Sequence, residues 1–277
     1  MNWTEVLDQA EKNGVRVKSV YQEEMQKSIL TALSRKGCFS DIVFHGGTAL
    51  RLFHGNPRFS EDIDLIVKEG VDHFDLSRHM KDVAGMCMND FPFLDSVEAR
   101  AQKVEPELQR YVLKTISDDP RQRIRVHIEL ANVPSYQNSP RILDFPPYQP
   151  AIRVEEASEI LADKVRALGY RPFLKGRDLW DVYFLNVERS VKLEWDLVVK
   201  KIDDYREEVD EIEARYRNVE KKIEENGLKV LSNEMDRFLP RQVLDSYKPI
   251  YDEILDSVIE LISSFNGSKE SDSDEDQ

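Results

Sequence analysis

The segment FHGGTALRLFHGNPRFSEDIDLIV, from Phe44 to Val67, restricts the possible folds more than any other part of the chain. Its apolar and glycine positions predict, in order, a strand over Asp41–His45, a glycine turn at Gly46 and Gly47, a helix over Thr48–Phe53, a stop at Gly55, Asn56 and Pro57, and a strand over Ile63–Val67. We therefore expect a strand, turn, helix, loop, strand unit.

Two carboxylates lie on the second strand of this unit. Asp62 and Asp64 are two residues apart, so both side chains are expected to leave the same face, while Ile63 and Leu65 point into the core. Two hard oxygen ligands side by side are what Mg²⁺ requires when it is held against a triphosphate. Asp62 and Asp64 are therefore the predicted metal ligands and catalytic carboxylates.

The turn before the helix has the features of a phosphate site. Gly46 and Gly47 let the backbone approach a phosphate closely, and Thr48 adds a hydroxyl at a helix N-terminus, where the dipole favours an anion. We expect Arg58 and Ser60 either to reach phosphate oxygens or to hold the loop. A glycine pair or an Asp-x-Asp pair alone is common at protein surfaces. Here their order and the thirteen residues between them, 49–61, point to nucleotide chemistry.

The rest of the chain predicts a mixed N-terminal region and a helical C-terminal region. The first contains helices over Tyr21–Lys36 and Val71–Asn89 and strands over Ser96–Val104, Leu108–Ser117 and Gln122–Ala131. A loop with several prolines, Pro134–Pro150, is the expected domain boundary. Helices are expected over Val154–Leu168, Arg177–Val187, Trp195–Glu225, Glu234–Phe238 and Tyr247–Phe265. The charged Trp195–Glu225 stretch is interpreted as a solvated amphipathic helix, with a partner-binding surface as the alternative.

Composition separates three segments and excludes several classes of protein. We expect a core domain over 1–150, a helical domain over 151–266 that completes the active site, and a disordered acidic tail over 267–277. No apolar run is long enough to span a membrane and no signal peptide is recognisable, so a cytoplasmic protein without membrane association is expected. Two cysteines without a ligand pattern exclude a disulfide framework and a structural zinc site.

Net charge constrains any nucleic-acid partner. Lys and Arg number 39 against 53 Asp and Glu, a net charge of −14, which opposes broad attraction to a polynucleotide. An RNA end would have to meet a local basic patch. The candidates for that patch are Arg51, Arg58, Arg123, Arg125, Lys175 and Arg177.

The motifs resemble those of a known superfamily. A glycine pair, a short helix and then Asp-x-Asp are typical of nucleotidyltransferases related to DNA polymerase beta. More narrowly, GGTALRL and RFSEDIDL, followed by ADKVRAL and KGRDLWDVYFL, are similar to the AbiEii/AbiGii toxin family of prokaryotic toxin–antitoxin and phage-defence loci; the resemblance covers Phe44–Leu185. It implies an α+β fold with a mixed sheet and a helical domain, NTP as donor, Mg²⁺ as cofactor, an RNA acceptor such as a tRNA 3′ end, and a cognate antitoxin.

The resemblance also assigns roles to residues, each with a structural alternative. It carries over to Gly47, Thr48, Asp62, Asp64, Lys164, Asp178 and Asp181. Lys164 lies among apolar helix positions and is expected to meet the triphosphate; the alternative is a solvent-facing lysine. Asp178 and Asp181 share a helix face, although Asp178 has the alternatives of pairing with Arg177 or Arg171 or of capping its helix, and Asp181 that of a structural role.

A third carboxylate is expected from a later strand. Arg123, Arg125, His127 and Glu129 alternate with apolar residues, which predicts a strand with one polar face that lines a cleft. In the superfamily a carboxylate on such a strand helps to activate the attacking hydroxyl as a base, and strand parity makes Glu129 the candidate. His45 and His54, beside the turn, are interpreted as packing or loop residues.

Two further functions stay open at this stage. The same chemistry with a small molecule or a protein side chain as acceptor is slightly favoured by the acidic net charge and more strongly disfavoured by the family resemblance. A non-catalytic module that binds a nucleotide or a partner is the third possibility, against which the intact carboxylates, glycines and lysine argue.

Overall fold

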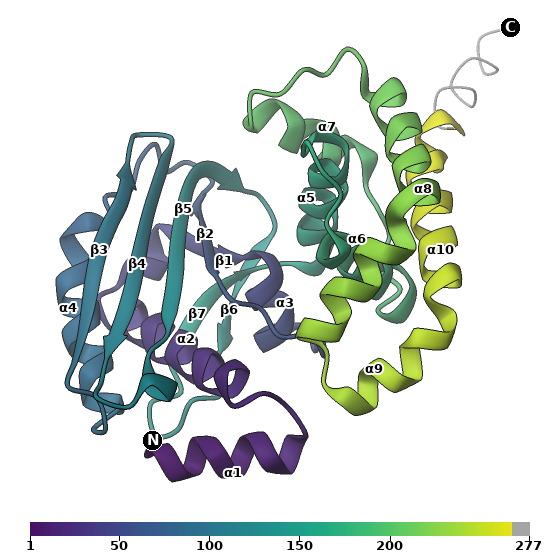
Figure 1. The fold of residues 1–277 in the computed structure, drawn as a ribbon. Helices are drawn as coiled ribbons and strands as arrows, with labels where there is room; N and C mark the ends of the chain where they lie inside the picture. Colours follow the sequence, from purple (N-terminus) through teal and green to yellow (C-terminus); the bar gives the residue numbers. More distant parts are fainter. Residues whose placement is uncertain (268–277) are drawn as a thin grey trace, which may run out of the picture. The chain divides into compact units, whose positions relative to one another are not determined.

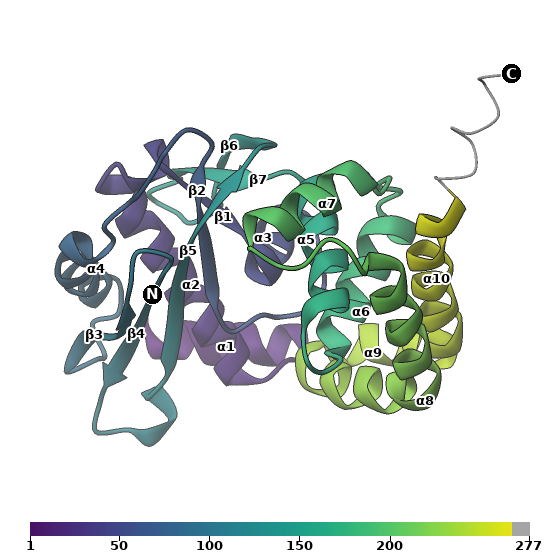
Figure 2. The ribbon, with the colours of Figure 1, turned by 90° about the horizontal axis from the view of Figure 1, so that it is seen from above.

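The chain folds into two compact units. The structure, a computed structural model, describes residues 1–267 and divides the chain into Met1–Glu156 and Ala157–Gln277 (Figures 1 and 2). Of the tail expected to be disordered, residues 268–277 lie outside the described residues. Each unit is described by itself.

The first unit is built on one mixed seven-stranded sheet with the order β3-β4-β5-β2-β1-β7-β6. The strands are β1 (Ile42–His45), β2 (Ile63–Lys68), β3 (Ser96–Val104), β4 (Leu108–Ile116), β5 (Arg125–Ser135), β6 (Asn138–Ile142) and β7 (Ala151–Glu155). The pairs β2–β5 and β1–β7 are parallel and the other neighbours are antiparallel. The predicted α+β fold with a mixed sheet is confirmed.

Helices supply the apolar layer of this unit. They are α1 (Trp3–Asn13), α2 (Val17–Arg35), α3 (Gly46–Phe53) and α4 (Ser77–Asp90), with 3₁₀ turns at Cys38–Ser40 and Pro120–Gln122. The positions of α2 that recur at helical spacing, Met25, Ile29 and Leu33, are completely buried. In Figure 1, α2 and α4 lie behind strands β3 to β5, so the opposite face of these strands is left for polar side chains.

Two cysteines are buried in this unit. Cys38 and Cys87 are free thiols, as expected. Burial raises the pKa of Cys38 to about 11 and that of Cys87 to about 12. Because the thiolate is the nucleophile and the metal ligand, neither cysteine is poised for reaction.

The predicted loop at Pro134–Pro150 is wrong. β5 continues to Ser135, and β6 follows it before the chain enters β7. β7 pairs with β1 on one side and β6 on the other, so it belongs to the first unit and the helix expected from Val154 begins only at Ala157. Pro140 is compatible with β6 because this strand is at the sheet edge, where a missing N–H costs no ladder bond.

The second unit is helical, as predicted. It contains α5 (Ala157–Tyr170), α6 (Gly176–Tyr183), a π turn (Phe184–Glu188), α7 (Trp195–Asp204), α8 (Ile212–Phe238), α9 (Arg241–Tyr247) and α10 (Tyr251–Ser263), and 3₁₀ turns at Lys248–Ile250 and Ser264–Gly267. Among residues 1–267 no helix combines the length and apolarity needed to cross a bilayer.

The prediction of a single helix over Trp195–Glu225 is wrong in two respects, since the helix is interrupted and its second part is longer than expected. The chain leaves the helix after Asp204, and α8 then runs without interruption to Phe238. Tyr216, Ile223 and Leu231 belong to a buried stripe that passes the predicted end, because α8 packs along α10. Gly227 lies inside α8, where the missing side chain leaves room for Leu255 of α10.

A buried ion cluster joins α5 to α7. Lys201 of α7 has no exposed surface and pairs with Glu159 of α5, which is also completely buried. The same ammonium lies 3.5 Å from Asp163, one turn further along α5. Buried charges of this kind are tolerated only when they are paired.

We expect Lys201→Met to destabilise the protein by about 3–5 kcal/mol, because it removes the buried cation that pairs with Glu159 and lies 3.5 Å from Asp163. Urea denaturation measures the loss as a change in the free energy of unfolding. Lys200→Met, a change of the exposed neighbour on the same helix, is the control and should alter that free energy by less than about 0.5 kcal/mol. Equal effects of the two variants would show that the buried cluster contributes nothing to the fold.

Candidate functional site

Five polar side chains form a row across the sheet of the first unit. Strand register places Arg110 opposite Glu129, Glu129 beside Asp64, and Asp64 opposite His45. The pairing of Phe44 with Val154 brings His45 beside Glu155 in β7. Residues in register on neighbouring strands share a face. The row therefore places two carboxylates, Asp64 and Glu129, next to each other.

Asp62 immediately precedes β2 and is two residues from Asp64. Ile63 and Leu65 are 0% and 1% exposed, whereas both aspartates are partly exposed. The apolar residues point into the core, as the alternation predicts. Asp62, Asp64 and Glu129 thus offer three hard oxygen donors on adjacent strands at a partly accessible surface.

Gly46 is required by the position of Asp64. Its φ is +75°, a conformation that residues with a side chain rarely adopt. A Cβ atom added at this position would lie 2.6 Å from Oδ2 of Asp64. The glycine therefore lets the carboxylate lie directly against the first turn of α3.

Gly47 allows a second close approach, from the loop before β2. A Cβ atom here would lie 2.5 Å from a guanidinium nitrogen of Arg58 and 3.0 Å from Oγ of Ser60. Arg58 is 1% exposed and donates to the carbonyl of Phe59 at 3.1 Å. Of the two roles expected for Arg58 and Ser60, these contacts favour the second, which is to hold the loop.

Thr48 differs from the expectation. Its hydroxyl was expected to face a phosphate, but the side chain is completely buried and donates to the main-chain carbonyl of Asp62. The contact arises because α3 packs on β2, which brings the helix N-terminus over the start of that strand. Thr48 therefore fixes the backbone that carries Asp62.

Glu129 pairs with Arg110 of the neighbouring strand. Nε of Arg110 lies 2.5 Å from a carboxylate oxygen, and both side chains are more than a third exposed. The hydrogen bond raises the pKa of Arg110. The pair fixes the orientation of Glu129 at the sheet surface.

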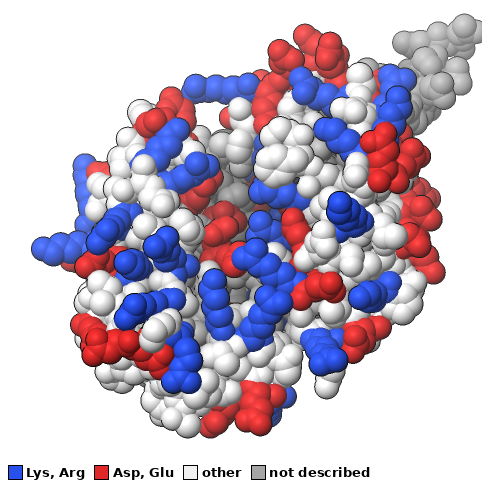
Figure 3. Space-filling model, viewed as in Figure 1, with Lys and Arg blue, Asp and Glu red and all other residues white. Residues whose placement is uncertain are grey.

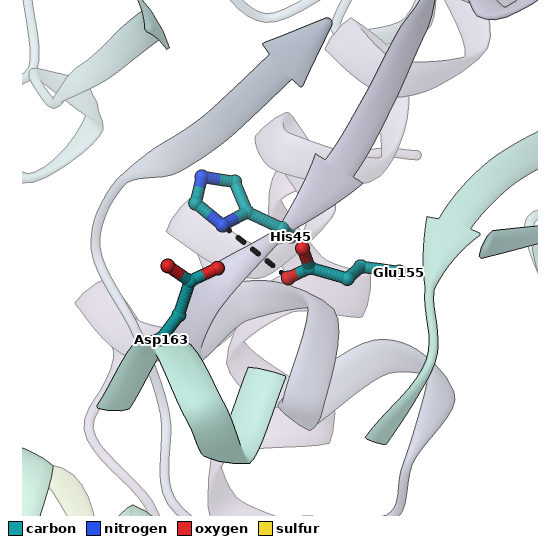
Figure 4. Close-up of side chains that lie close together, drawn as sticks. All are labelled: His45, Glu155 and Asp163. Carbon is teal, nitrogen blue, oxygen red and sulfur yellow. Dashed lines mark ion pairs between the residues drawn. The ribbon is translucent and has the colours of Figure 1, made fainter. Parts of the chain in front are cut away.

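The two histidines beside the turn both contact Glu155. Figure 4 shows the His45 ring facing the Glu155 carboxylate, with 3.5 Å between Nδ1 and Oε2. Nε2 of His54 lies 3.0 Å from the Glu155 carbonyl oxygen. Glu155 is completely buried. Asp163, also drawn, belongs to the second unit and contacts Lys201 there.

A hollow of about 540 Å³ opens beside Asp62. Elements α2, β4 and β5 and the loop before β2 form its wall. Its lining residues are Lys18, Gln22, Glu61, Asp62, Lys114, Arg123, Ile124, Arg125 and His127. Gln22 of α2 connects the loop before β2 to β5, because its amide donates to the carbonyls of Glu61 at 2.9 Å and Arg125 at 3.2 Å.

The residues predicted on the later motifs meet in the second unit. Lys164 of α5 lies 3.0 Å from Asp178 and 2.8 Å from Asp181, both on α6. The two carboxylates are 2% and 0% exposed. Asp178 also pairs with Arg171, one of its two expected alternatives. The solvent-facing alternative for Lys164 is wrong, since only 13% of its side chain is exposed.

The six basic residues expected to form a patch have different surroundings. Arg51 pairs with Glu23 and Arg177 with Glu234, while Arg58 is buried. Lys175 lies near the exposed ring of Phe173. Only Arg123 and Arg125 line the hollow. Sequence reasoning missed two further lysines of the hollow, Lys18 and Lys114. Lys114 could have been found, because alternation along β4 puts it on the same face as Arg110.

We expect Gly46→Ala to destabilise the protein by about 1–3 kcal/mol. The left-handed backbone alone costs a residue with a side chain about 1–2 kcal/mol, and the new methyl group would displace the Asp64 carboxylate. Gly85→Ala is the control, because this exposed glycine lies within helix α4 and a Cβ atom there meets nothing within 4 Å. It should leave the free energy of unfolding unchanged or raise it by about 0.4–1 kcal/mol. A Gly46→Ala protein as stable as the Gly85→Ala protein would contradict the close approach.

Comparisons with known proteins identify a family and similar folds for this chain. The sequence model of a family described as nucleotidyl transferase AbiEii toxin, type IV TA system, matches residues 28–257. A crystal structure of an H. pylori protein, solved as a candidate nucleotidyltransferase, is 19% identical and has a TM-score of 0.57 over 90% of this chain and 96% of its own. JHP933 from Helicobacter pylori is 18% identical, with a TM-score of 0.54 over 92% and 97%. No curated protein sequence matches significantly.

Proposed function

The chain belongs to the AbiEii family of nucleotidyltransferase toxins of toxin–antitoxin systems, and from this premise we propose that it transfers a nucleoside monophosphate from an NTP to a hydroxyl group of an RNA. The observation that carries the proposal is the arrangement of Asp62, Asp64 and Glu129 around the glycine turn that begins α3. A tRNA 3′ end is the proposed acceptor, so the activity is proposed to be cytoplasmic and opposed by a cognate antitoxin.

The residues present fit Mg²⁺. Asp62 and Asp64 are partly exposed hard oxygen donors, and Gly46 leaves no side chain between the second carboxylate and the helix N-terminus. We propose that these two aspartates hold the ion. Bound there, Mg²⁺ would neutralise charge on the triphosphate.

The glycine turn is proposed to bind the phosphates. The first N–H groups of α3 have no partner within the helix and lie at its positive end. Gly46 and Gly47 keep this backbone free of side chains. Three nearby side chains would position this backbone and would not bind the phosphates themselves. They are Arg58, Ser60 and Thr48, whose contacts hold the turn and the loop together.

Glu129 is proposed as the general base. It would take the proton of the acceptor hydroxyl while the acceptor oxygen bonds to the α-phosphorus. The bond from the α-phosphorus to the oxygen bridging to the β-phosphate then breaks, and pyrophosphate leaves with that oxygen. Arg110 supports this role by holding the carboxylate in place through their ion pair.

For the second unit the proposal rests mainly on the family motif. Lys164 is proposed to supply positive charge to the departing phosphates. Asp178 and Asp181 would position its ammonium, which lies within 3.0 Å of both carboxylates. Because Arg171 shares Asp178, the cluster holds two cations against two carboxylates.

We expect Asp62→Asn and Asp64→Asn each to abolish transfer while the protein stays folded, because each removes a proposed metal ligand. Purified protein is incubated with Mg²⁺, each α-labelled NTP in turn and total tRNA, and the products are resolved on a denaturing gel. Glu69→Gln, an exposed carboxylate just after β2, is the control and should label tRNA as the wild type does.

The position of the label decides between acceptors. A labelled tRNA band with the wild type supports the proposal, and label on the protein or on a small molecule would replace the RNA acceptor. Activity retained by both single aspartate variants would remove the assignment of the metal site. No label with any acceptor would indicate a non-catalytic binding module.

We expect Glu129→Gln to lower kcat by about 10²–10⁴-fold, the usual contribution of a general base. If Glu129 serves only as the partner of Arg110, the same change should cost less than about 1 kcal/mol of stability and leave kcat unaltered, because exposed ion pairs contribute little. Single-turnover kinetics with saturating NTP, beside thermal unfolding, separate the two roles. Arg110→Gln tests the positioning role and should lower kcat less than Glu129→Gln does.

A further inference from the structure

The hollow beside Asp62 contains an unbalanced set of cations. Lys18 comes from the first turn of α2, Lys114 from β4 and Arg125 from β5. Within residues 1–267 none of these three side chains has an ion-pair partner. Elsewhere on the sheet, Arg100 of β3 pairs with Glu98, and Arg110 of β4 pairs with Glu129. In a chain with a net charge of −14, three unpaired cations around one hollow indicate an anionic ligand.

Strand register makes the imbalance more pronounced. Lys114 and Arg125 are directly opposite each other in the antiparallel pair β4–β5. Like charges in this position repel and destabilise a sheet. Four residues along β4, the same ladder carries the attractive pair of Arg110 and Glu129. We call this cross-strand pair of Lys114 and Arg125 the rung. An anion bound between the two cations would make the rung favourable.

The position of the rung suits a phosphate of the acceptor strand. Asp62 precedes the residue paired with Ile128 and so lies alongside His127, and Arg125 is two residues before His127, at the start of β5. Two residues of a strand span about 6.6 Å, a length that a single nucleotide covers. An acceptor hydroxyl near Asp62 would therefore place its neighbouring phosphates within reach of Lys114 and Arg125.

The charges of the surface agree with a local site. Figure 3 shows Lys and Arg side chains gathered over strands β3 to β5, with acidic side chains between them. Within the hollow four cations, Lys18, Lys114, Arg123 and Arg125, face two acids, Glu61 and Asp62. Arg123 is partly engaged, because it donates to the carbonyls of Ser117 and Asp118.

We propose that Lys114 and Arg125, together with Lys18, bind backbone phosphates of the acceptor RNA next to its reacting 3′ end. This inference rests on the proposed function and adds the acceptor subsite to it. The three residues are positioning residues, since they hold the strand and do not contact the reacting atoms.

The test compares two double variants with the same change in charge. Lys114→Gln with Arg125→Gln removes the rung, and Arg100→Gln with Lys103→Gln removes two cations from β3, outside the hollow. Binding of total tRNA is titrated without NTP at several salt concentrations. Thermal unfolding is measured in parallel, because removal of a repulsive rung should raise Tm or leave it unchanged.

We expect the rung variant to bind tRNA about tenfold more weakly and to lose about 1–2 units from the slope of log affinity against log salt, while the β3 variant binds as the wild type does. In the transfer assay KM for tRNA should rise and KM for NTP should stay unchanged. Lys114→Arg with Arg125→Lys, which keeps both charges, should restore binding.

Equal binding by the two glutamine variants would overturn the inference alone, provided that the wild type labels tRNA. A rung variant that loses tRNA binding only because Tm falls would also overturn it. If the wild type neither binds nor labels tRNA, the RNA acceptor of the proposed function fails as well, and the separate label on protein or on a small molecule identifies that outcome.

Discussion

The contact between Gly46 and Asp64 is the constraint on which the rest of the site depends. β2 lies between β1 and β5, so Asp64 has His45 on one side and Glu129 on the other. The carboxylate can occupy this position only because the first residue of α3 has no side chain and a positive φ. Thr48 then bonds the turn to the backbone of Asp62, and Arg58 of the loop before β2 lies against Gly47. The turn and the strand are therefore one rigid part, which is the preorganisation that phosphoryl chemistry needs.

The sequence predicted the elements whose signals are local. The prediction of β1, α3, β2 and β3 follows from local apolar spacing and from nearby glycine and proline, and their observed bounds differ from the predictions by a few residues at most. The strands β6 and β7 were missed because β6 contains a proline and three more prolines separate the two strands, whereas β7 is held by pairing with a distant strand, β1, and β6 by pairing with β7. The extent of α8 was missed for the same reason, since the face it buries is set by α10. Tertiary pairing overrides local propensity in these places.

For the site, the alternation of residues along a strand predicted which face each side chain occupies, but the sequence did not predict its interaction partners. Alternation along one strand correctly put Ile63 and Leu65 in the core and singled out Glu129 on a polar face, which the register then brought beside Asp64. Nothing in the sequence indicated that the Thr48 hydroxyl would be used by a carbonyl fourteen residues away, or that Arg110 would pair with Glu129. Which strands are neighbours decides these contacts, and a single sequence contains little information on strand order.

The negative net charge of the protein does not prevent an anion from binding in the basic hollow. At physiological ionic strength the Debye length is about 8 Å, so exposed acids farther away are largely screened from a ligand inside the hollow. Among the charges that line the hollow itself, cations exceed acids. The repulsive rung of Lys114 and Arg125 breaks a local rule of sheet stability, and such violations are expected where a protein keeps charge for a ligand and not for its fold. The acidic remainder of the surface would at the same time oppose non-specific binding of the proposed RNA acceptor outside the hollow.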